Sequence, residues 1–573
     1  MKVCNIMMSL RARTAKIWSA VTCHRFPAMA TCRHSRAAYS GSPNSRDASL
    51  MLDGDKSPAE SADKSAHSKG RRFGHVVRHC LPFALLALIV TFAVLAEAAQ
   101  TNTPTTWEKS IVRLEVARKS YDYYQPWNRR NERAMKTGLV VGERQILATA
   151  QDLSDQTLVR VQKNGRGKWT TARVEWIDYH ANLALLTADD AAFWSDLHPA
   201  NLNGKPPGEG DPLQIVRWRD GKLENRQAEF TQFTVRESDG SAINHVQMEL
   251  DSEIRDAGSG EPVVTDSRIA GIIFSQRGRA CRVIPASFIR SVLDAHKSGN
   301  QRALGYFHFY WQPAENLASL AQLKLTGEPR GVLVINVPER LDGGTPVLKP
   351  RDIILQIDGF DVDMQGDYTD PEFGSLTLEN LATRGKWAGD DVKMKLWRDG
   401  KPLDVIYRLP GYDFPNALVP IAVRDQPPDY LIVGGLVFQP LTTPYLQRWG
   451  AEWERTAPFR LNHYRSDEAT KTKPSLVILS QVLPDKFNIG YQENRSLVVS
   501  QVNGQRVTSL GELRDALKQP RDDFHVIDFV PNESLQRIVL AAGDAEREAT
   551  DRILKRFGIA DAVQITSKTA AAK

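Results

Sequence analysis

The chain has 573 residues, 42% hydrophobic and 25% charged, which is ordinary for a soluble protein and long enough for three or four domains. Its formal charge of +6 is unevenly spread, because residues 1–99 hold 14 Lys and Arg against 6 Asp and Glu, whereas residues 100–573 hold 60 against 62. A body this close to neutral offers no basic surface for nucleic acid, so we expect no nucleic-acid partner.

Residues 1–80 form a basic leader. Within it, residues 40–72 are rich in Ser, Asp, Lys and Ala and poor in aromatic side chains. Such a segment cannot bury enough apolar surface to fold, so we predict that the leader is disordered. A start codon at Met51 is an alternative that would shorten it.

An uncharged apolar run, LPFALLALIVTFAVLA, follows at residues 81–96. Three arginines lie shortly before it, and an Ala-x-Ala sequence ends it. This pattern predicts that residues 81–99 are a signal peptide or a membrane anchor, with a buried core helix as the alternative. The basic flank favours a body that is exported to the periplasm or secreted, and that stays on the membrane if the segment is uncleaved.

Cysteine usage also separates the leader from the body. Four of the five cysteines precede residue 81, and only Cys281 follows it. The body can therefore form no intramolecular disulfide, and its sequence suggests neither a zinc cluster nor a thiol catalytic pair. We expect no metal and no cofactor.

From residue 111 to about residue 292 the chain alternates short apolar runs with turn residues. Examples are SIVRLEV, TGLVVGERQILAT and IAGIIFSQ, and Asn-Gly and Asp-Gly turns separate several of the runs. Many short strands at this spacing predict an all-β barrel or sandwich. The sequence PASFIRSVLDAHKSG, residues 285–299, then predicts a closing amphipathic helix with Gly299 near its end.

Two later segments, residues 305–410 and 474–530, share one order of elements. Each has a strand, an Asp-Gly or Asn-Gly turn, a strand, a helical stretch and a further strand. The first strand, the turn and the second strand lie in KPRDIILQIDGFDV and in RSLVVSQVNGQRV. Two copies of one small α+β module are the economical explanation.

Three motifs of the β-rich region and three C-terminal segments are similar to those of a known family. The motifs are TGLVVGERQILATAQDL, DYHANLALL and DAGSGEPVV, and the segments are DYLIVGGLVFQPLTTPYL, LVILSQVLPDKFNIGY and ILKRFGIA. Over about residues 105–565 their order resembles the HtrA/Deg family, in the plant-type and bacterial branch with a divergent second PDZ-like domain. The resemblance implies a mainly β protein with a trypsin-like double β-barrel at 105–297, a PDZ domain at 301–411 and a divergent PDZ-like domain at 412–566.

The resemblance also places the catalytic positions, and only one of the three keeps its chemistry. Gln151 stands at the histidine, Asn182 at the aspartate and Ser259 at the nucleophile. Glutamine has no nitrogen that titrates near neutral pH, so Ser259 would keep its proton and remain a poor nucleophile. We therefore predict a pseudoprotease, in which the serine is a turn hydroxyl.

The oxyanion hole is altered in the same direction. The resemblance assigns it to Ala257 and Gly258, where Ala257 replaces a glycine, and Glu261 replaces another glycine two residues after the serine. A Cβ at residue 257 resists a positive φ, and a carboxylate at residue 261 opposes a developing oxyanion.

A relocated base is the alternative to lost catalysis. His180 lies two residues before Asn182, and a strand would place both side chains on one face. The simpler interpretation of His180 is a surface histidine in a turn. A lysine or glutamate partner for Ser259 also stays open, since no spacing identifies one.

The 301–411 module carries the candidate peptide site. PDZ domains bind an extended peptide as an added strand, and backbone amides receive its terminal carboxylate. The stretch LGYFHFYW offers Tyr306, Phe307 and Phe309, and Leu376 begins the candidate helical groove. The alternative is that the aromatic side chains pack the module's own core or its contact with the β-domain. The second module lacks a glycine-rich carboxylate loop, so we expect it to serve assembly or to cap the first.

The sequence YQPWNRRNERAMKTG, residues 124–138, is a polar insertion ahead of the candidate site. In the family such loops serve trimer contacts or regulation, so the resemblance implies a homo-oligomer, for example a trimer. A solvated loop is the alternative.

The leading interpretation is an extracytoplasmic HtrA/Deg-like pseudoprotease that binds peptides or unfolded segments, with a scaffolding, chaperone or regulatory role in protein quality control. The runner-up is an active serine endopeptidase in which Ser259 uses a non-standard base. A third interpretation is an assembly subunit without a peptide ligand.

Overall fold

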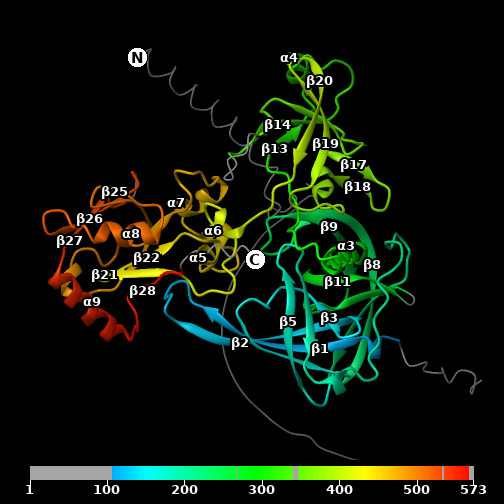
Figure 1. Ribbon diagram of the computed structural model, residues 1–573, viewed down its shortest axis with the longest axis horizontal. Helices are drawn as coiled ribbons and strands as arrows, with labels where there is room; N and C mark the ends of the chain where they lie inside the picture. The colour runs from blue at the N-terminus through cyan, green and yellow to red at the C-terminus, as the bar shows by residue number, and fades with distance from the viewer. Residues whose placement is uncertain (1–105, 266–267, 340–345, 532–533, 567–573) are drawn as a thin grey trace, which may run out of the picture. The chain divides into compact units, whose positions relative to one another are not determined.

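The structure is a computed structural model that describes residues 106–265, 268–339, 346–531 and 534–566 (Figure 1). The leader and the predicted signal or anchor segment lie outside the described residues. Among the described residues, no helix is both long and apolar enough to cross a membrane.

Two closed six-stranded barrels form the predicted β-rich region, which confirms the barrel prediction. The strands are β1 (Ile111–Tyr121), β2 (Arg129–Gly142), β3 (Gln145–Ala148), β4 (Gln156–Gln162), β5 (Thr170–Asp178), β6 (Leu183–Ala188), β7 (Leu213–Arg219), β8 (Lys222–Glu237), β9 (Asn244–Ser252), β10 (Pro262–Thr265), β11 (Arg268–Arg277) and β12 (Ala280–Pro285). They pair in the orders β1-β2-β3-β6-β5-β4 and β10-β11-β12-β9-β8-β7. Closure leaves no free sheet edge in either barrel.

Each barrel has its own apolar core, and a third cluster joins them. Inward residues such as Leu114 fill the first barrel, and residues such as Met248 fill the second. The joining cluster includes Ile111 of β1 and Trp218 of β7, whose indole N–H donates to the Ile111 carbonyl at 2.7 Å. This buried hydrogen bond fixes the two barrels against each other around the candidate site.

The predicted closing helix is present as α3 (Ala286–Lys297). Phe288, Ile289 and Val292 lie on its buried face and belong to the cluster that joins the barrels. The helix is followed by Gly299 at φ +78°, a left-handed conformation that glycine adopts without steric cost.

Most of the predicted insertion at residues 124–138 is strand and not loop, which corrects that expectation. β2 pairs with β1 along its whole length, from Arg129 opposite Tyr121 to Leu139 opposite Ile111. Residues 129–135 are almost all exposed. Residues 129–133 are all polar, so this half of the strand shows none of the apolar alternation by which a strand is predicted. Only residues 122–128 form the turn of this long hairpin.

The first α+β module is a sheet in the order β13-β14-β15-β19-β20, in which β16 also pairs with β15, and β17 and β18 pair separately. Its elements are β13 (Tyr310–Pro313), α4 (Leu317–Gln322), β14 (Val332–Asn336), β15 (Ile353–Ile357), β16 (Phe360–Asp361), β17 (Asp367–Asp370), β18 (Gly374–Thr377), the 3₁₀ helix η3 (Leu378–Ala382), β19 (Asp391–Arg398) and β20 (Lys401–Arg408). The predicted helical stretch is therefore only a short 3₁₀ helix.

The C-terminal module has a larger sheet, in the order β27-β26-β24-β23-β22-β21-β28, with β25 paired to β24. Its elements are β21 (Tyr430–Val433), β22 (Leu436–Pro440), α5 (Thr443–Gln447), α6 (Trp453–Thr456), α7 (Phe459–Asn462), β23 (Val477–Val482), β24 (Leu497–Val502), β25 (Gln505–Arg506), α8 (Leu510–Leu517), β26 (Phe524–Phe529), β27 (Arg537–Ala541), α9 (Asp544–Phe557) and β28 (Val563–Gln564).

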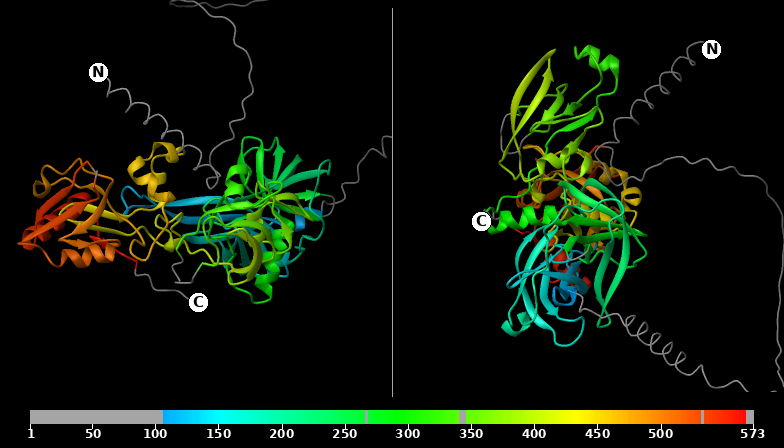
Figure 2. Two further views of the ribbon diagram at one scale, coloured as in Figure 1. Left: turned by 90° about the horizontal axis from the view of Figure 1, so that it is seen from above. Right: turned by 90° about the vertical axis from the view of Figure 1, so that its right-hand side faces the viewer.

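Helices α8 and α9 cover opposite faces of this sheet, drawn from yellow to red in Figures 1 and 2. Leu431 of β21 packs in one cluster with Leu513 of α8, whereas the adjacent Ile432 packs in another with Ile553 of α9. Neighbouring residues of a strand face opposite sides of a sheet, so both faces are buried.

The predicted repeat extends to individual hydrogen bonds. In the first module, Asp358 begins the turn after β15 at φ +47°, and its carboxylate accepts from the Lys393 amide at 2.8 Å. In the second, Asn503 begins the turn after β24 at φ +53°, and its side-chain oxygen accepts from the Val526 amide at 2.8 Å. Asp and Asn tolerate this left-handed conformation better than other residues with a side chain.

We expect Asn503→Ala to destabilise the C-terminal module by about 2 kcal/mol. The change removes the bond to Val526 and a second bond, from the Asn503 amide group to the Ala516 carbonyl at 2.9 Å. It also places alanine in the left-handed region, which asparagine tolerates better. Hydrogen exchange of peptides from β24 and β26 measures the effect. Arg506→Ala, at an exposed position of the same hairpin, is the control, and equal exchange in the two variants would contradict the prediction.

Candidate functional site

The structure brings the first two triad positions together. Gln151 follows β3, and Asn182 precedes β6, which is the barrel neighbour of β3. The side-chain oxygen of Asn182 accepts from the backbone N–H of Gln151 at 3.0 Å, and the Asn182 carbonyl accepts from Ala150 at 3.2 Å. The hydrogen bonds that position this part of a triad are thus present without the imidazole.

Ser259 precedes β10 of the second barrel and is attached to the first. Its carbonyl accepts from the Thr137 amide of β2 at 2.8 Å. A Cβ added at Gly260 would lie 2.6 Å from the Thr137 carbonyl oxygen, so the serine loop lies tightly on this strand. Within the described part of the chain, the Ser259 hydroxyl makes no hydrogen bond, and the Gln151 side chain is exposed.

Side chains of the same domain occupy the amides that would form the oxyanion hole. The Ala257 amide donates to the side-chain carbonyl of Gln276 at 2.7 Å. The amides of Gly258 and Ser259 both donate to one carboxylate oxygen of Glu261, at 2.9 and 2.8 Å. A trypsin-like site needs such amides to be available to the developing oxyanion.

Glu261 contacts the serine loop directly, which its sequence position does not predict. Its side chain is buried, with 4% of the residue exposed, and hydrogen bonds from amides to a carboxylate are about twice as strong as those between neutral groups. The sequence predicts a carboxylate that repels an oxyanion; in the structure this carboxylate accepts from two amides of the serine loop. We call Glu261 and its two amide bonds the internal plug.

Lys136 is the functional candidate that the sequence analysis missed. It lies on β2 with 3% of the residue exposed, and its ammonium donates to the Thr149 hydroxyl at 2.8 Å. Burial lowers its pKa to about 8, although the charges of Asp152 and Glu261 oppose this shift. A lysine directly before the apolar run TGLVV was the signal that could have identified it.

His180 lies in the predicted turn, but it is not a surface residue, so that expectation is wrong. Only 7% of it is exposed; its Nδ1 lies 3.2 Å from the Ser241 hydroxyl, and its ring stacks on Phe414 with centroids 4.2 Å apart. Burial, helped by the charge of Arg424, lowers its pKa to about 4. The structure therefore gives His180 a packing role and does not bring it to the serine.

A segment at the start of the C-terminal module, before β21, contacts the first barrel near Gln151 and Asn182. The Asp425 carboxylate accepts from the Asp155 amide at 2.8 Å and from the Tyr179 hydroxyl at 2.6 Å. The Arg424 guanidinium lies 4.4 Å from the centroid of the Tyr179 ring. Residues next to both Gln151 and Asn182 are thus held by a segment more than 200 residues further along the chain.

The candidate peptide-binding side chains of the 301–411 module mostly face its interior. Phe307, Phe309 and Leu376 are buried, and Tyr306 packs half-buried against the same cluster. A Cβ at Gly305 would lie 2.8 Å from a methyl carbon of Leu409, so the loop before these aromatics is filled by its own module. These side chains therefore pack the core, which was the alternative to their binding a peptide.

The turn of the β1–β2 hairpin contacts the C-terminal module of the same chain. The carbonyls of Tyr123 and Tyr124 accept from the side-chain amides of Gln439 and Gln481, at 3.2 and 2.5 Å. The predicted role of this segment was oligomer contact or regulation, and the described contact is intramolecular.

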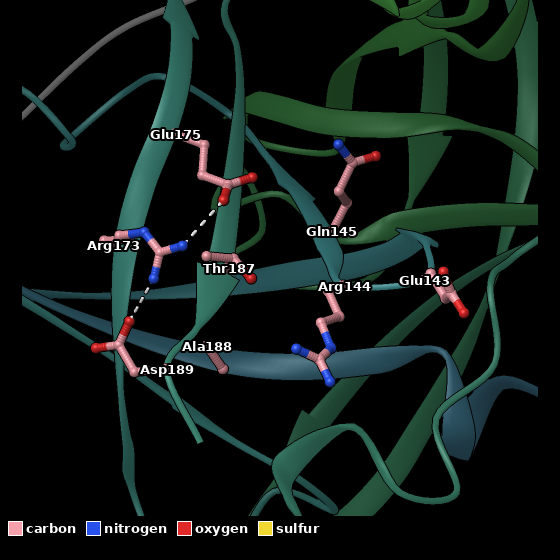
Figure 3. Close-up of a pocket in the computed structure, with 8 residues that line it drawn as sticks. All are labelled: Glu143, Arg144, Gln145, Arg173, Glu175, Thr187, Ala188 and Asp189. Carbon is pink, nitrogen blue, oxygen red and sulfur yellow. Dashed lines mark hydrogen bonds and ion pairs between the residues drawn. The ribbon is translucent and has the colours of Figure 1, made fainter. Parts of the chain in front are cut away.

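A polar pocket of about 470 Å³ lies on the first barrel, away from the triad positions (Figure 3). Arg173 of β5 pairs there with Glu175 at 3.3 Å and with Asp189 at 2.7 Å. These charges satisfy one another, so the pocket has the character of a solvated surface. Among the described residues, no group of three or more His, Cys, Asp or Glu side chains could hold a metal ion.

Two closed six-stranded barrels, followed by two small α+β modules, define a trypsin-like fold with PDZ-like modules. The model of a family described as PDZ domain matches residues 419–564. The chain is 26% identical over 473 residues to the chloroplastic protease Do-like 2 of Arabidopsis thaliana, covering 78% of this chain and 74% of that protein. It is 26% identical over 485 residues to the mitochondrial protease Do-like 4 of the same plant, covering 81% and 87%. The chain is therefore similar to HtrA/Deg-type serine proteases with a PDZ domain.

A solved structure is similar as well. It is the HtrA-type protease AlgW with decapeptide, which is 15% identical, with a TM-score of 0.41, over 54% of this chain and 98% of that one.

We expect the first barrel to lose stability as the pH falls from about 6.5 to about 4, and His180→Phe to reduce this loss. Because burial lowers the pKa of His180 in the folded state, the unfolded chain takes up the proton first, and unfolding is favoured below about pH 6.5. The full effect is roughly 3 kcal/mol. Phenylalanine keeps the stacking on Phe414 and cannot titrate.

Hydrogen exchange of peptides from β5 and β6, compared at neutral and acidic pH, measures this difference. The second buried histidine whose pKa is lowered to about 4, His245, titrates in both proteins and is therefore cancelled by the comparison. The same pH dependence in the wild type and in His180→Phe would contradict the prediction.

Proposed function

We propose that this HtrA/Deg-type protein is a pseudoprotease that binds peptides or unfolded protein segments, with a scaffolding, chaperone or regulatory role in protein quality control. One observation carries the proposal: side chains of the domain already accept from the amides at the oxyanion-hole positions, Gln276 from Ala257 and Glu261 from Gly258 and its neighbour Ser259. Gln151 at the imidazole position removes the base as well. With neither group available, the protein accelerates neither the attack by serine nor the departure of the amine.

The alternative is an active serine endopeptidase, and Lys136 is the observation in its favour. A buried amine with a pKa of about 8 is partly unprotonated at mildly alkaline pH, as a general base must be. The chain's relatives carry the names of proteases. Against this, the Lys136 amine donates to the Thr149 hydroxyl, which occupies it within the barrel.

The other parts of the proposal concern partners and location. PDZ domains bind extended peptides, which supports peptide capture, either by the 301–411 module or by the C-terminal module. We propose a homo-oligomer, for example a trimer, as the family resemblance implies. The apolar run at residues 81–96 supports an extracytoplasmic body, held on the membrane if the run is uncleaved.

The catalytic part is tested by rebuilding the site. The wild type is expected not to react with a fluorophosphonate probe or to cleave casein, because it lacks both the imidazole and a free oxyanion hole. The variant Gln151→His, Asn182→Asp, Ala257→Gly, Glu261→Gly is expected to become labelled at Ser259, since loss of a triad base costs roughly 10⁴- to 10⁶-fold in turnover. Labelling is read by intact-protein mass spectrometry.

Two controls decide between the proposal and its alternative. Ser259→Ala in the rebuilt background must abolish labelling, which shows that the probe reacts at this serine. Wild-type labelling that is lost in both Ser259→Ala and Lys136→Met would replace the pseudoprotease proposal with a serine-lysine endopeptidase.

Peptide capture is tested on the full chain with a random-sequence peptide library. We expect a subset of peptides to bind, and the wild type and Ser259→Ala to bind them equally, because Ser259 takes no part in binding. Affinity selection followed by calorimetry on the selected peptides measures this. If no peptide is retained, the assembly-subunit interpretation replaces this part of the proposal.

A further inference from the structure

A basic pocket lies in the C-terminal module, apart from the triad positions. Its volume is about 540 Å³, and the guanidinium groups of Arg448, Arg460 and Arg495 line it. Arg448 follows α5, Arg460 lies in α7, and Arg495 precedes β24. Tyr124 of the β1–β2 turn also lines the pocket, so four separate segments assemble it. Among its lining residues there is no aspartate or glutamate.

The charges of Arg448 and Arg495 meet no aspartate or glutamate among the residues that line this pocket. Neither Arg448 nor Arg495 forms an ion pair with any residue that the structure describes, and the Arg448 Nη1 atom is buried without a hydrogen-bond partner there. Burial lowers the pKa of Arg448 and the charge of Asp122 opposes this shift, but the Asp122 carboxylate already accepts from the Tyr124 amide at 2.8 Å. A buried guanidinium donor without an acceptor is costly, so a bound anion would be favourable here.

Aromatic rings hold Arg448 in place in advance. Its guanidinium lies 4.6 Å from the ring centroid of Tyr124, 4.6 Å from that of Tyr445 and 4.3 Å from that of Trp449. Such contacts fix the position of the cation without neutralising it. The side chain thus loses little conformational entropy when it binds a ligand, which strengthens binding.

The pocket offers further contacts suited to a peptide. Ser496, at its floor, is buried, and its hydroxyl lies 3.4 Å from that of Tyr445. Beside the pocket, Phe459 has 83% of its surface exposed, directly between the lining residues Pro458 and Arg460. A basic pocket next to an exposed aromatic ring fits a ligand that combines an anionic group with an apolar side chain.

We propose that this pocket binds an acidic peptide segment, whose carboxylate groups pair with Arg448, Arg460 and Arg495. The rest of residues 100–573 supplies slightly more acidic than basic side chains, so the cluster is a local exception and not part of a basic surface. This inference deepens the proposed peptide-binding function by giving it a site and a chemical preference, and it does not depend on the loss of catalysis.

The test uses the full chain and a short labelled peptide of glutamate with one phenylalanine, measured by fluorescence anisotropy beside its glutamine counterpart. We expect the glutamate peptide to bind more tightly, with an affinity that falls as salt is added. Arg495→Gln is expected to weaken it about tenfold. Arg506→Gln removes the same charge from another exposed position of the module and is expected to change the affinity less than twofold.

Each other outcome overturns the inference. Equal binding of the two peptides, or equal effects of Arg495→Gln and Arg506→Gln, would show that the pocket does not select acidic peptides. Inorganic phosphate should compete with the peptide, and binding of phosphate without binding of peptide would reduce the pocket to a small-anion site. If library peptides bind and none depends on Arg495, the proposed function stands and this inference fails.

Discussion

The site depends on one interaction: the Glu261 carboxylate accepts hydrogen bonds from two backbone amides. In a working protease these N–H groups await the charge that develops on the substrate, and a partly buried amide without an acceptor is costly. Here the amides of Gly258 and Ser259 donate to the Glu261 carboxylate, three and two residues further along the chain. The plug therefore satisfies two donors of the serine loop within the domain, which supports the proposed loss of catalysis.

The hydrogen bonds at Gln151, Asn182 and Ser259 show how the backbone is held at these positions. Asn182 still accepts from the Gln151 amide, a bond that needs only an oxygen and not a charge or a titrating ring. The Ser259 carbonyl still accepts from Thr137 across the two barrels. The backbone at these positions is thus held by hydrogen bonds that an amide oxygen accepts as well as a carboxylate does.

The sequence predicts those features that depend on neighbouring residues. The strands of both barrels, helix α3 and the repeated turns at Asp358 and Asn503 follow from alternation and turn chemistry within a few positions. The exposed half of β2 was missed because its partner strand, and not its own pattern, makes it a strand. The burial of His180 depends on Phe414, and the basic pocket depends on four segments joined only by folding, so no local pattern could predict either.

Burial of the region around Asn182 connects the proposed loss of catalysis to the packing of the chain. His180 is covered by Phe414, and Tyr179 donates to Asp425, so residues beside Asn182 support the segment at the start of the C-terminal module. A catalytic rim must stay open to a substrate, whereas a packing surface gains stability from being covered. Since the same turn cannot be both, the contacts of this segment and the hydrogen bonds to Glu261 both support the proposed pseudoprotease.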